Sequence, residues 1–425
     1  MKNSSRTSLF TSPVNNILAL ALFLSLLFIA CDDQSTLFGP ERASEDIESV
    51  ISLKASAQQP ESYIIVFHSD RVPGNQVGRT VSELARAHGL QPGFVYQHSI
   101  SGFAATLPES RVQALMADNR VKSVTPDVEI SLFPQPAHHR PDHGRGPGNG
   151  DDPDNGGDDD ESTQVVPWGI TRVGGPMVDS GKHAWVIDSG IDLNHKDLNV
   201  NQSLGKNCVP RGRNSFDDGQ GHGTHVAGTI AAIDNIIDVV GVSESTSLVP
   251  VRVLDNSGSG MLSWIICGVD HVAGNFSDGD VANMSLGGRT TDTSLDEAVL
   301  AAADKGLLFA IAAGNSGADT KDFTPARTGT HENVYTVATI DQNDNFTSWS
   351  NYGEAVTFAG PGVAILSTKR GGGTEEKSGT SMSSPHIAGL LLLDQLCSDG
   401  TTTGPDKQQY SIAYRCNDDN LIVSN

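Results

Sequence analysis

Regular alternation of apolar and polar positions begins near residue 61. Residues 63–67 (YIIVF) form an apolar run that predicts a strand, and apolar residues three and four positions apart over 77–88 predict a helix. Two strand-like runs follow (FVY and GFAATL), then a second helical pattern over 112–116 and a last strand over 121–124. This order of elements predicts a small ferredoxin-like α+β domain over residues 61–133.

A second pattern starts near residue 163, where short apolar runs alternate with helical patterns. The runs are HAWVI (183–187), LVPVRVL (248–254), VANMSL (281–286), LLFAIAA (307–313) and VYTVATI (334–340). Strands that alternate with helices predict an α/β fold whose mostly parallel sheet is covered by helices on both faces. We therefore expect a three-layer domain over residues 163–425, with functional residues beyond the carboxyl ends of its strands.

Two segments outside these patterns show neither periodicity. Residues 31–60 are polar and predict a flexible tether, and residues 134–162 are dominated by Pro, Gly, Asp and Asn and predict a disordered linker. An acidic stretch at 158–161 lacks the spaced ligands and central glycine of a calcium-binding loop. We interpret that stretch as solvated linker.

The N-terminus has the pattern of an export signal. Lys2 and Arg6 precede an apolar run over 17–30, which is short for a membrane-spanning helix but typical of a signal peptide over residues 1–30. The run ends in FIAC, which resembles the lipobox of bacterial lipoproteins with Phe28 in place of the usual Leu. Two alternatives remain: Cys31 carries a lipid anchor, or the signal is an ordinary secretory one. Both predict an exported protein, either membrane-attached as a lipoprotein or extracellular.

Composition narrows the range of partners. The chain has 425 residues, with 28 Lys and Arg against 51 Asp and Glu, and a formal net charge of −23. This charge repels phosphate backbones, so we do not expect nucleic acid as a partner. A hydrophobic fraction of 37% with 45 glycines is typical of a globular protein rich in turns. We expect a monomer.

With Cys31 assigned to lipidation, four cysteines remain in a protein that we expect in an oxidising compartment. Four cysteines allow three disulfide pairings. Our hypothesis pairs Cys208 with Cys267, because both lie in the core of the second domain. It pairs Cys397 with Cys416, because these two flank a short C-terminal segment.

Four polar residues of the second domain stand at the ends of predicted strands or the starts of predicted helices. They are Asp188 after HAWVI, His222 in GHGTHVAGTIAA (221–232), Asn315 in FAIAAGNSG, and Ser381 in GTSMSSPHIAG (379–389). The N-terminal end of a helix favours developing negative charge, which suits Ser381 as a nucleophile. Each residue taken alone has a structural alternative, such as a turn or a helix cap.

Acid, base and nucleophile occur in the order Asp, His, Ser, and the chain from about Gln164 to the helix after Ser381 resembles the subtilisin family. The resemblance implies a subtilisin-like fold and a serine endopeptidase. His222 would take the proton of Ser381 as its hydroxyl attacks a peptide carbonyl, and Asp188 would orient the imidazole. Asn315 and the Ser381 N–H would form the oxyanion hole. Loss of such an Asn costs about a hundredfold to a thousandfold in turnover, a magnitude known for subtilisin.

In this light the domain over 61–133 resembles the inhibitory propeptide of subtilisins, and an unrelated ferredoxin-like module is the alternative. The resemblance implies an inactive precursor, or zymogen, with the propeptide as its own intramolecular inhibitor. Residues 163–169 (TQVVPWG) resemble the start of mature subtilisins. We therefore expect the precursor to cut itself near Ser162.

The resemblance also implies two segments that hold an extended peptide between them, with glycines that let its backbone approach. The residues expected to contact protein or peptide substrates are Gly258, Ser259, Gly260, Ser285, Leu286, Gly287, Gly288, Ala312 and Gly314. Main-chain hydrogen bonds do not read side chains, so we expect broad specificity. Ser316 brings no charge to the pocket wall, which favours a hydrophobic or mid-sized residue before the cut.

Two other functions remain open at this point. A processing protease that cuts after basic residues would need acidic groups near the pocket. A silent complex, in which the propeptide stays bound and the protein acts as a binding module, would not need the intact catalytic motifs. Metal catalysis by His222 and His225 lacks a third ligand, so we interpret His225 and His386 as hydrogen-bonded structural residues.

Three separated pieces of sequence match the strong calcium site of subtilisins, and the resemblance implies a structural calcium ion. Its expected ligands are Gln164, Asp197, Ile233, Asn235, Ile237 and Val239. An ordinary surface loop is the alternative. If Gln164 must reach the ion as a near-terminal residue, cleavage has to free it first.

Overall fold

The computed structural model describes residues 61–134, 164–178, 181–210 and 215–417. The predicted signal peptide (1–30), Cys31, the tether, Ser162 and all of the predicted linker except Pro134 lie outside these residues. Among the helices of the described part, none combines the length and the apolar character needed to cross a membrane.

The N-terminal domain has the predicted split βαββαβ order. Its main elements are β1 (Glu61–Phe67), α2 (Gly74–His88), β2 (Gln91–Tyr96), β3 (Gly102–Leu107), α3 (Val112–Met116) and β4 (Val121–Pro126). The strands form an antiparallel sheet in the order β2-β3-β1-β4. The apolar face of α2, with Val77, Val81 and Leu84, packs on one face of this sheet and is buried there.

The second domain is built on a nine-stranded sheet in the order β20-β21-β17-β16-β14-β12-β7-β10-β8, in which every neighbouring pair except β20 with β21 is parallel. The strands are β7 (His183–Asp188), β8 (Lys206–Asn207), β10 (Ser247–Arg252), β12 (Val281–Met284), β14 (Leu308–Ala312), β16 (Val334–Ile340), β17 (Val356–Pro361), β20 (Leu396–Thr403) and β21 (Gln409–Arg415). Four helices pack on it: α5 (His222–Ala231), α6 (Leu262–Ala273), α7 (Ser294–Ala303) and α8 (Thr380–Leu392).

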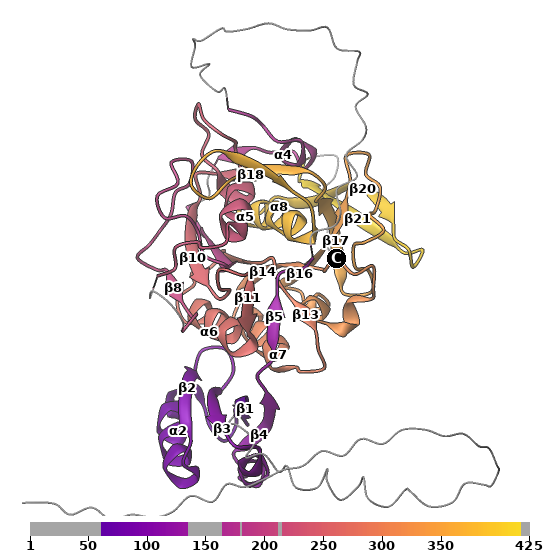
Figure 1. Ribbon diagram of the computed structural model, residues 1–425. Coiled ribbons are helices and arrows are strands. Elements are labelled where there is room, and N and C mark those ends of the chain that lie inside the picture. The colour runs from indigo at the N-terminus through magenta and orange to yellow at the C-terminus, as the bar shows by residue number, and fades with distance from the viewer. Residues whose placement is uncertain (1–60, 135–163, 179–180, 211–214, 418–425) are drawn as a thin grey trace, which may run out of the picture. The chain divides into compact units, whose positions relative to one another are not determined.

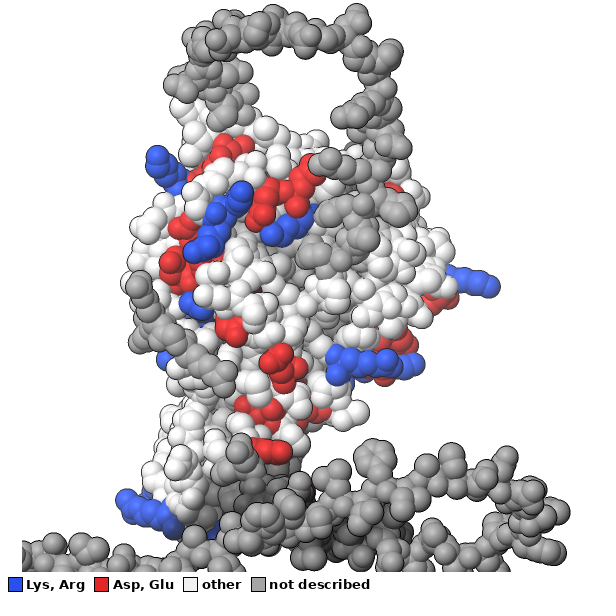
Figure 2. Space-filling model, in the orientation of Figure 1, with Lys and Arg blue, Asp and Glu red and all other residues white. Residues whose placement is uncertain are grey.

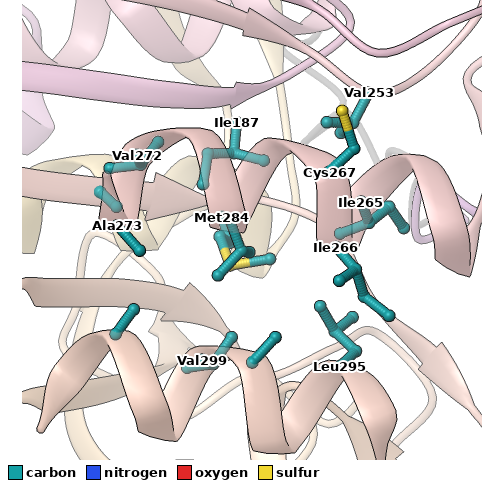
Figure 3. Packing of buried hydrophobic residues seen from close by; sticks show 14 of the residues in the cluster. Ile187, Val253, Ile265, Ile266, Cys267, Val272, Ala273, Met284, Leu295 and Val299 are labelled. Carbon is teal, nitrogen blue, oxygen red and sulfur yellow. The ribbon is translucent and has the colours of Figure 1, made fainter. Parts of the chain in front are cut away.

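The helices cover both faces of the sheet, and Figure 1 shows α6 and α7 on one side and α5 and α8 on the other. Successive residues of β7 point to opposite faces: Ile187 belongs to the cluster under α6 and α7, and Val186 to the cluster under α5 and α8. Figure 3 shows Met284 between α6 and α7 in the first of these clusters. The predicted three-layer α/β fold is confirmed.

Short elements complete the described part of the chain. They are α4 (Trp168–Arg172), the strand pairs β5 (Glu129–Ser131) with β11 (Ser259–Met261), β6 (Met177–Val178) with β9 (Ser243–Glu244), β13 (Gly288–Arg289) with β15 (Phe323–Thr324) and β18 (Ile365–Thr368) with β19 (Thr374–Lys377), and single 3₁₀ turns at Glu109–Arg111, Thr320–Asp322 and Ala326–Thr328.

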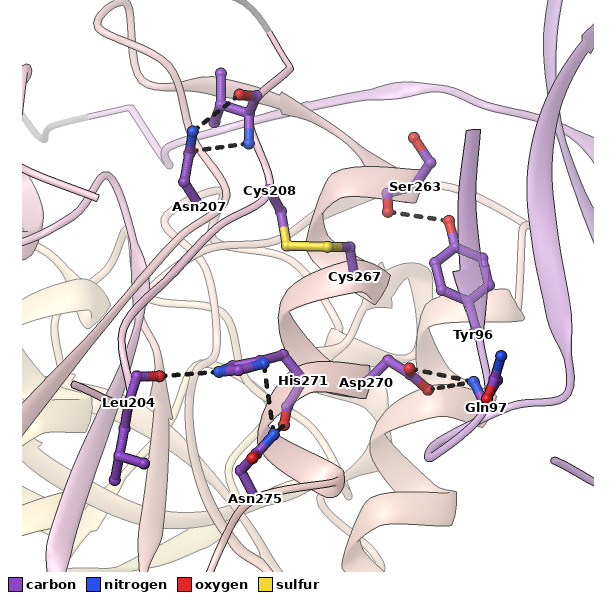
Figure 4. The surroundings of a disulfide bond; sticks show 11 residues. Tyr96, Gln97, Leu204, Asn207, Cys208, Ser263, Cys267, Asp270, His271 and Asn275 are labelled. Carbon is purple, nitrogen blue, oxygen red and sulfur yellow. Dashed lines mark hydrogen bonds between the residues drawn. A yellow bond between two sulfur atoms is a disulfide. The ribbon is translucent and has the colours of Figure 1, made fainter. Parts of the chain in front are cut away.

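Both predicted disulfides are present. Cys208 is bonded to Cys267 on α6, with 6.0 Å between their Cα atoms (Figure 4). Cys397 on β20 is bonded to Cys416, which follows β21, with 4.9 Å between their Cα atoms. The second bond therefore closes the C-terminal hairpin that forms the edge of the large sheet.

The two domains belong to one compact unit, Gln58–Asn425, and α6 makes much of their contact. The N-terminal end of α6 is capped from the other domain: Asp127 accepts hydrogen bonds from the Ser263 N–H (2.9 Å) and hydroxyl (2.6 Å). The Tyr96 hydroxyl donates to the carbonyl of Ser263 at 3.0 Å (Figure 4). Nearer the C-terminal end of α6, Asp270 binds the loop after β2.

Candidate active site

The predicted acid and base meet at the ends of neighbouring elements. Asp188 is the last residue of β7 and His222 the first of α5, and both are buried. The His222 Nδ1 lies 2.9 and 3.0 Å from the two carboxylate oxygens of Asp188. This contact favours a proton on Nδ1, which leaves Nε2 as the basic nitrogen. Nε2 has no hydrogen-bond partner among the described residues.

Ser381 is the second residue of α8, in the first turn, where the helix dipole favours negative charge. Its hydroxyl donates to the backbone oxygen of Ser285 at 3.1 Å, so its proton is not directed at the imidazole in this state. In return, the buried hydroxyl of Ser285 donates to the backbone oxygen of Ser381 (2.8 Å). These bonds fix the first turn of α8 against the loop after β12.

Asn315 follows β14 and is oriented by α8. Its Oδ1 accepts from both the N–H and the hydroxyl of Thr380, each at 2.9 Å, so its Nδ2 must point the other way. That nitrogen donates to the carbonyl of Pro134 at 3.0 Å. A side-chain N–H fixed in advance at the start of α8 is the kind of donor needed to bind an oxyanion.

The residues predicted to bind substrate surround the chain's own segment 129–134. β5 pairs antiparallel with β11, with Ile130 opposite Gly260, and the Leu132 N–H donates to the carbonyl of Gly258 at 2.9 Å. A methyl group on Gly288 would lie 2.6 Å from Ile130 Cδ1, so the Ile130 side chain packs directly on this glycine. Leu286 and Ser285 differ from the rest of the set. The side chain of Leu286 is buried in the core under α6 and α7, and the buried hydroxyl of Ser285 contacts α8.

Phe133 occupies a pocket beside these glycines. Its side chain is 5% exposed and packs against Ala312, Ala318, Phe323 and Ala326. Hypothetical methyl groups on Gly287 and Gly314 would lie 2.8 and 3.2 Å from its ring. The pocket therefore presents apolar surface and glycine backbone to an aromatic ring.

A buried carboxylate that the sequence did not single out ties the Asp188 loop to the His222 helix. Asp218 is 1% exposed and accepts from the hydroxyl of Ser189 (2.9 Å), the N–H of Gly221 (2.8 Å) and both the N–H (3.0 Å) and the hydroxyl (2.6 Å) of Thr224. The Ser189 hydroxyl also accepts from the Gly223 N–H (3.0 Å). In the sequence, only its position four residues before His222 could have pointed to Asp218.

The six residues predicted to bind calcium also come together. The amide nitrogen of Gln164 lies 2.6, 3.3 and 2.9 Å from the carbonyl oxygens of Ile233, Ile237 and Val239, and 3.5 Å from Asn235 Oδ1. The Asn235 amide donates to Asp197 Oδ1 at 2.7 Å. Burial raises the pKa of Asp197 to about 7. The predicted Gln164 ligand was its amide oxygen, but that oxygen accepts from the Asn235 N–H (3.0 Å) and the nitrogen faces the carbonyls. Carbonyl oxygens that converge beside a buried carboxylate are the donor set that Ca²⁺ prefers, so these residues fit the ion when the Gln164 amide turns its oxygen toward them.

The other two histidines have the structural surroundings expected of them. His225 Nε2 lies 3.0 and 3.1 Å from the carbonyl oxygens of Ile365 and Glu375, and His386 Nδ1 lies 2.8 Å from that of Met382. Burial lowers the pKa of His225 to about 3 and that of His386 to about 4, so both are neutral. Within the described ranges, no three His, Cys, Asp or Glu side chains are grouped to hold a metal ion.

Charge on one face of the molecule is dispersed. On the face shown in Figure 2, the Lys and Arg side chains of the described residues stand apart from one another and alternate with acidic ones. This distribution gives no support to a phosphate-binding surface on that face.

Comparisons with known proteins agree on both domains. Residues 185–396 match the model of the subtilase family, and residues 62–133 match that of the peptidase inhibitor I9 family. Subtilisin E of Bacillus subtilis (strain 168) is 42% identical over 239 residues, which are 55% of this chain and 62% of that protein. Subtilisin of Bacillus pumilus is 42% identical over 236 residues and 84% of its length.

A longer alignment and a solved structure extend the likeness. Alkaline serine exoprotease A of Vibrio alginolyticus is 33% identical over 373 residues, which are 84% of this chain and 64% of that protein. The crystal structure of a cold adapted subtilisin-like serine proteinase matches with a TM-score of 0.52 and 35% identity, over 60% of this chain and all of the other.

Proposed function

Because this chain belongs to the subtilase family, we propose that it is a broad-specificity serine endopeptidase made as a self-processing precursor. One observation supports this more than any other. Residues of the chain's own N-terminal domain lie in the cleft as an added strand, with a side chain in the pocket and a carbonyl on Asn315. The cleft therefore binds extended peptide.

In the proposed mechanism, His222 Nε2 takes the proton of Ser381 as Oγ attacks the peptide carbonyl. Asp188 holds the proton on Nδ1 and stabilises the imidazolium that forms. The Asn315 amide and the Ser381 N–H bind the oxyanion. His222 then gives its proton to the leaving nitrogen, and water, deprotonated in turn by His222, releases the acyl group from Ser381.

The pocket supports a bulky apolar residue before the cut. Its contacts with Phe133 come from alanine, phenylalanine and glycine, and these supply no carboxylate to pair with a basic side chain. The rival function of a processing protease that cuts after basic residues is therefore disfavoured.

The proposal extends to parts of the chain that the described residues do not include. We propose export by the signal over 1–30 with a lipid anchor at Cys31, a tether over 31–60, a propeptide domain over 61–133, a linker over 134–162 with a cut near Ser162, and a monomeric catalytic domain over 163–425. A structural Ca²⁺ held by Gln164, Asp197, Ile233, Asn235, Ile237 and Val239 would cross-link the chain near Gln164 to the loop after α5.

The test compares the full-length chain with its Ser381→Ala variant. We expect wild type to cut itself and to degrade casein, but not dibasic peptides, in a reaction that a serine-directed inhibitor stops. The variant should remain one uncut chain. N-terminal sequencing that finds normal maturation of the variant would exclude self-processing, and absence of all hydrolysis by wild type would favour the silent complex.

A further inference from the structure

Two successive residues of the segment in the cleft contact the pocket and the oxyanion donor. The side chain of Phe133 fills the pocket, whereas the carbonyl that accepts from Asn315 belongs to Pro134. A peptide bond is placed for attack when one residue puts its side chain in the pocket and its own carbonyl on the oxyanion donors. The seated segment does not meet that condition at either residue.

The residue after Phe133 is a proline, and this changes the chemistry of cutting the peptide bond between Phe133 and Pro134. To cut the bond between Phe133 and Pro134, the enzyme would transfer the Phe133 acyl group to Ser381 Oγ and release the proline nitrogen as a secondary amine. His222 would have to deliver a proton to that nitrogen. A ring carbon stands there in place of the N–H hydrogen of other residues, and it adds bulk where the imidazole approaches.

Proline nevertheless suits the binding of the segment. It restricts Phe133 to extended backbone, the conformation that β5 has over Glu129–Ser131. The sequence at 129–134 thus keeps the affinity of a substrate and loses its reactivity.

We propose that Pro134 makes the segment 129–133 a substrate-like inhibitor that the enzyme does not cut, so that the catalytic fragment begins beyond Gln135. This inference rests on the proposed function and assigns one residue to the choice between inhibitor and substrate. The released propeptide then retains Pro134 near its C-terminal end. It can bind in the cleft repeatedly without being cut there.

The test uses the full-length chain with Pro134→Ala and Pro134→Gln, each of which restores an ordinary N–H. Pro126→Ala, an exposed proline at the end of β4, is the matched control. N-terminal sequencing of the catalytic fragment and the intact mass of the propeptide locate each cut. Thermal unfolding of both variants in the Ser381→Ala background shows whether they fold.

We expect wild type and Pro126→Ala to give a catalytic fragment that begins beyond Gln135. Both variants at 134 should add a new fragment that begins at residue 134, and that product should appear at least tenfold faster than any wild-type cut at the same bond. A wild-type fragment that begins at Pro134 or Gln135 overturns the inference. So does an active, folded pair of variants that is cut only where wild type is cut, and in that case the proposed endopeptidase function still stands.

Discussion

Asp270 offers the sharpest test of what holds the N-terminal domain on the second domain. This carboxylate on α6 is 7% exposed and accepts four donors from one loop of the other domain. They are the N–H groups of Gln97 (3.0 Å), His98 (2.7 Å) and Ser99 (2.7 Å) and the hydroxyl of Ser99 (2.9 Å). Figure 4 shows Asp270 facing Gln97 beside the disulfide. Asp270→Ala removes all four acceptor contacts at once.

The expected magnitude follows from the charge of the acceptor. A hydrogen bond to a charged group contributes about 1.5–3 kcal/mol net. The four bonds share one carboxylate, and their donors regain water when the domains separate, so they are not additive. We take about 3 kcal/mol for the set, which corresponds to roughly a hundredfold shift of the equilibrium toward separated domains.

Hydrogen exchange on the uncut Ser381→Ala chain measures this shift at sites far from the substitution. The Leu132 N–H donates to Gly258, and the Leu262 N–H donates to Val128, so both are exposed when the domains separate. Both amides should exchange about a hundredfold faster in Asp270→Ala. Asp278→Ala, at an exposed position beyond the same helix, is the matched control and should change neither. Faster exchange at residues 97–99 alone would mean that the loop opens locally, and would refute the reasoning.

Four further predictions follow from the site. Asn315→Ala should lower kcat by about a hundredfold to a thousandfold, as is known for subtilisin, with little change in KM on a chromogenic peptide. Asp218→Asn should lower kcat roughly tenfold to a hundredfold and shift the pH–rate profile of the His222 step, because the carboxylate positions both elements of the Asp–His pair; an unchanged profile would limit it to a structural role. Replacing Cys397 and Cys416 together by Ala should lower the free energy of unfolding by about 3 kcal/mol in a denaturant titration, given the 19-residue separation. Excess chelator should shorten the half-life of the mature enzyme at elevated temperature but not that of Asp197→Ala, and equal wild-type half-lives with calcium and with chelator would contradict the calcium site.

The sequence predicted the features that depend on local pattern. Alternating strands and helices gave the three layers, and the ends of those elements located Asp188, His222, Asn315 and Ser381. A parallel sheet brings the carboxyl ends of its strands to one edge, so a motif at each end is enough to predict which side chains lie near one another.

Several contacts between distant segments were not predicted. Ile130 pairs with Gly260 and Asp270 binds the loop at 97–99, and neither segment carries a motif that names its partner. Asp218 looks like an ordinary loop residue in the sequence, because its donors come from the Asp188 loop, its own loop and α5. Buried polar groups of this kind are satisfied only by the tertiary structure.

The contacts of Gln164 change the expected order of maturation. We expected cleavage to free this residue before it could reach the calcium ligands, but its amide already accepts from the Asn235 N–H (3.0 Å) and donates to the Val239 carbonyl (2.9 Å) while Pro134 contacts Asn315 in the same uncut chain. Assembly of the proposed calcium site therefore would not require a cut. Stabilisation of the catalytic domain and clearance of its cleft are separate events, and calcium should stabilise the Ser381→Ala precursor as much as it stabilises the mature enzyme.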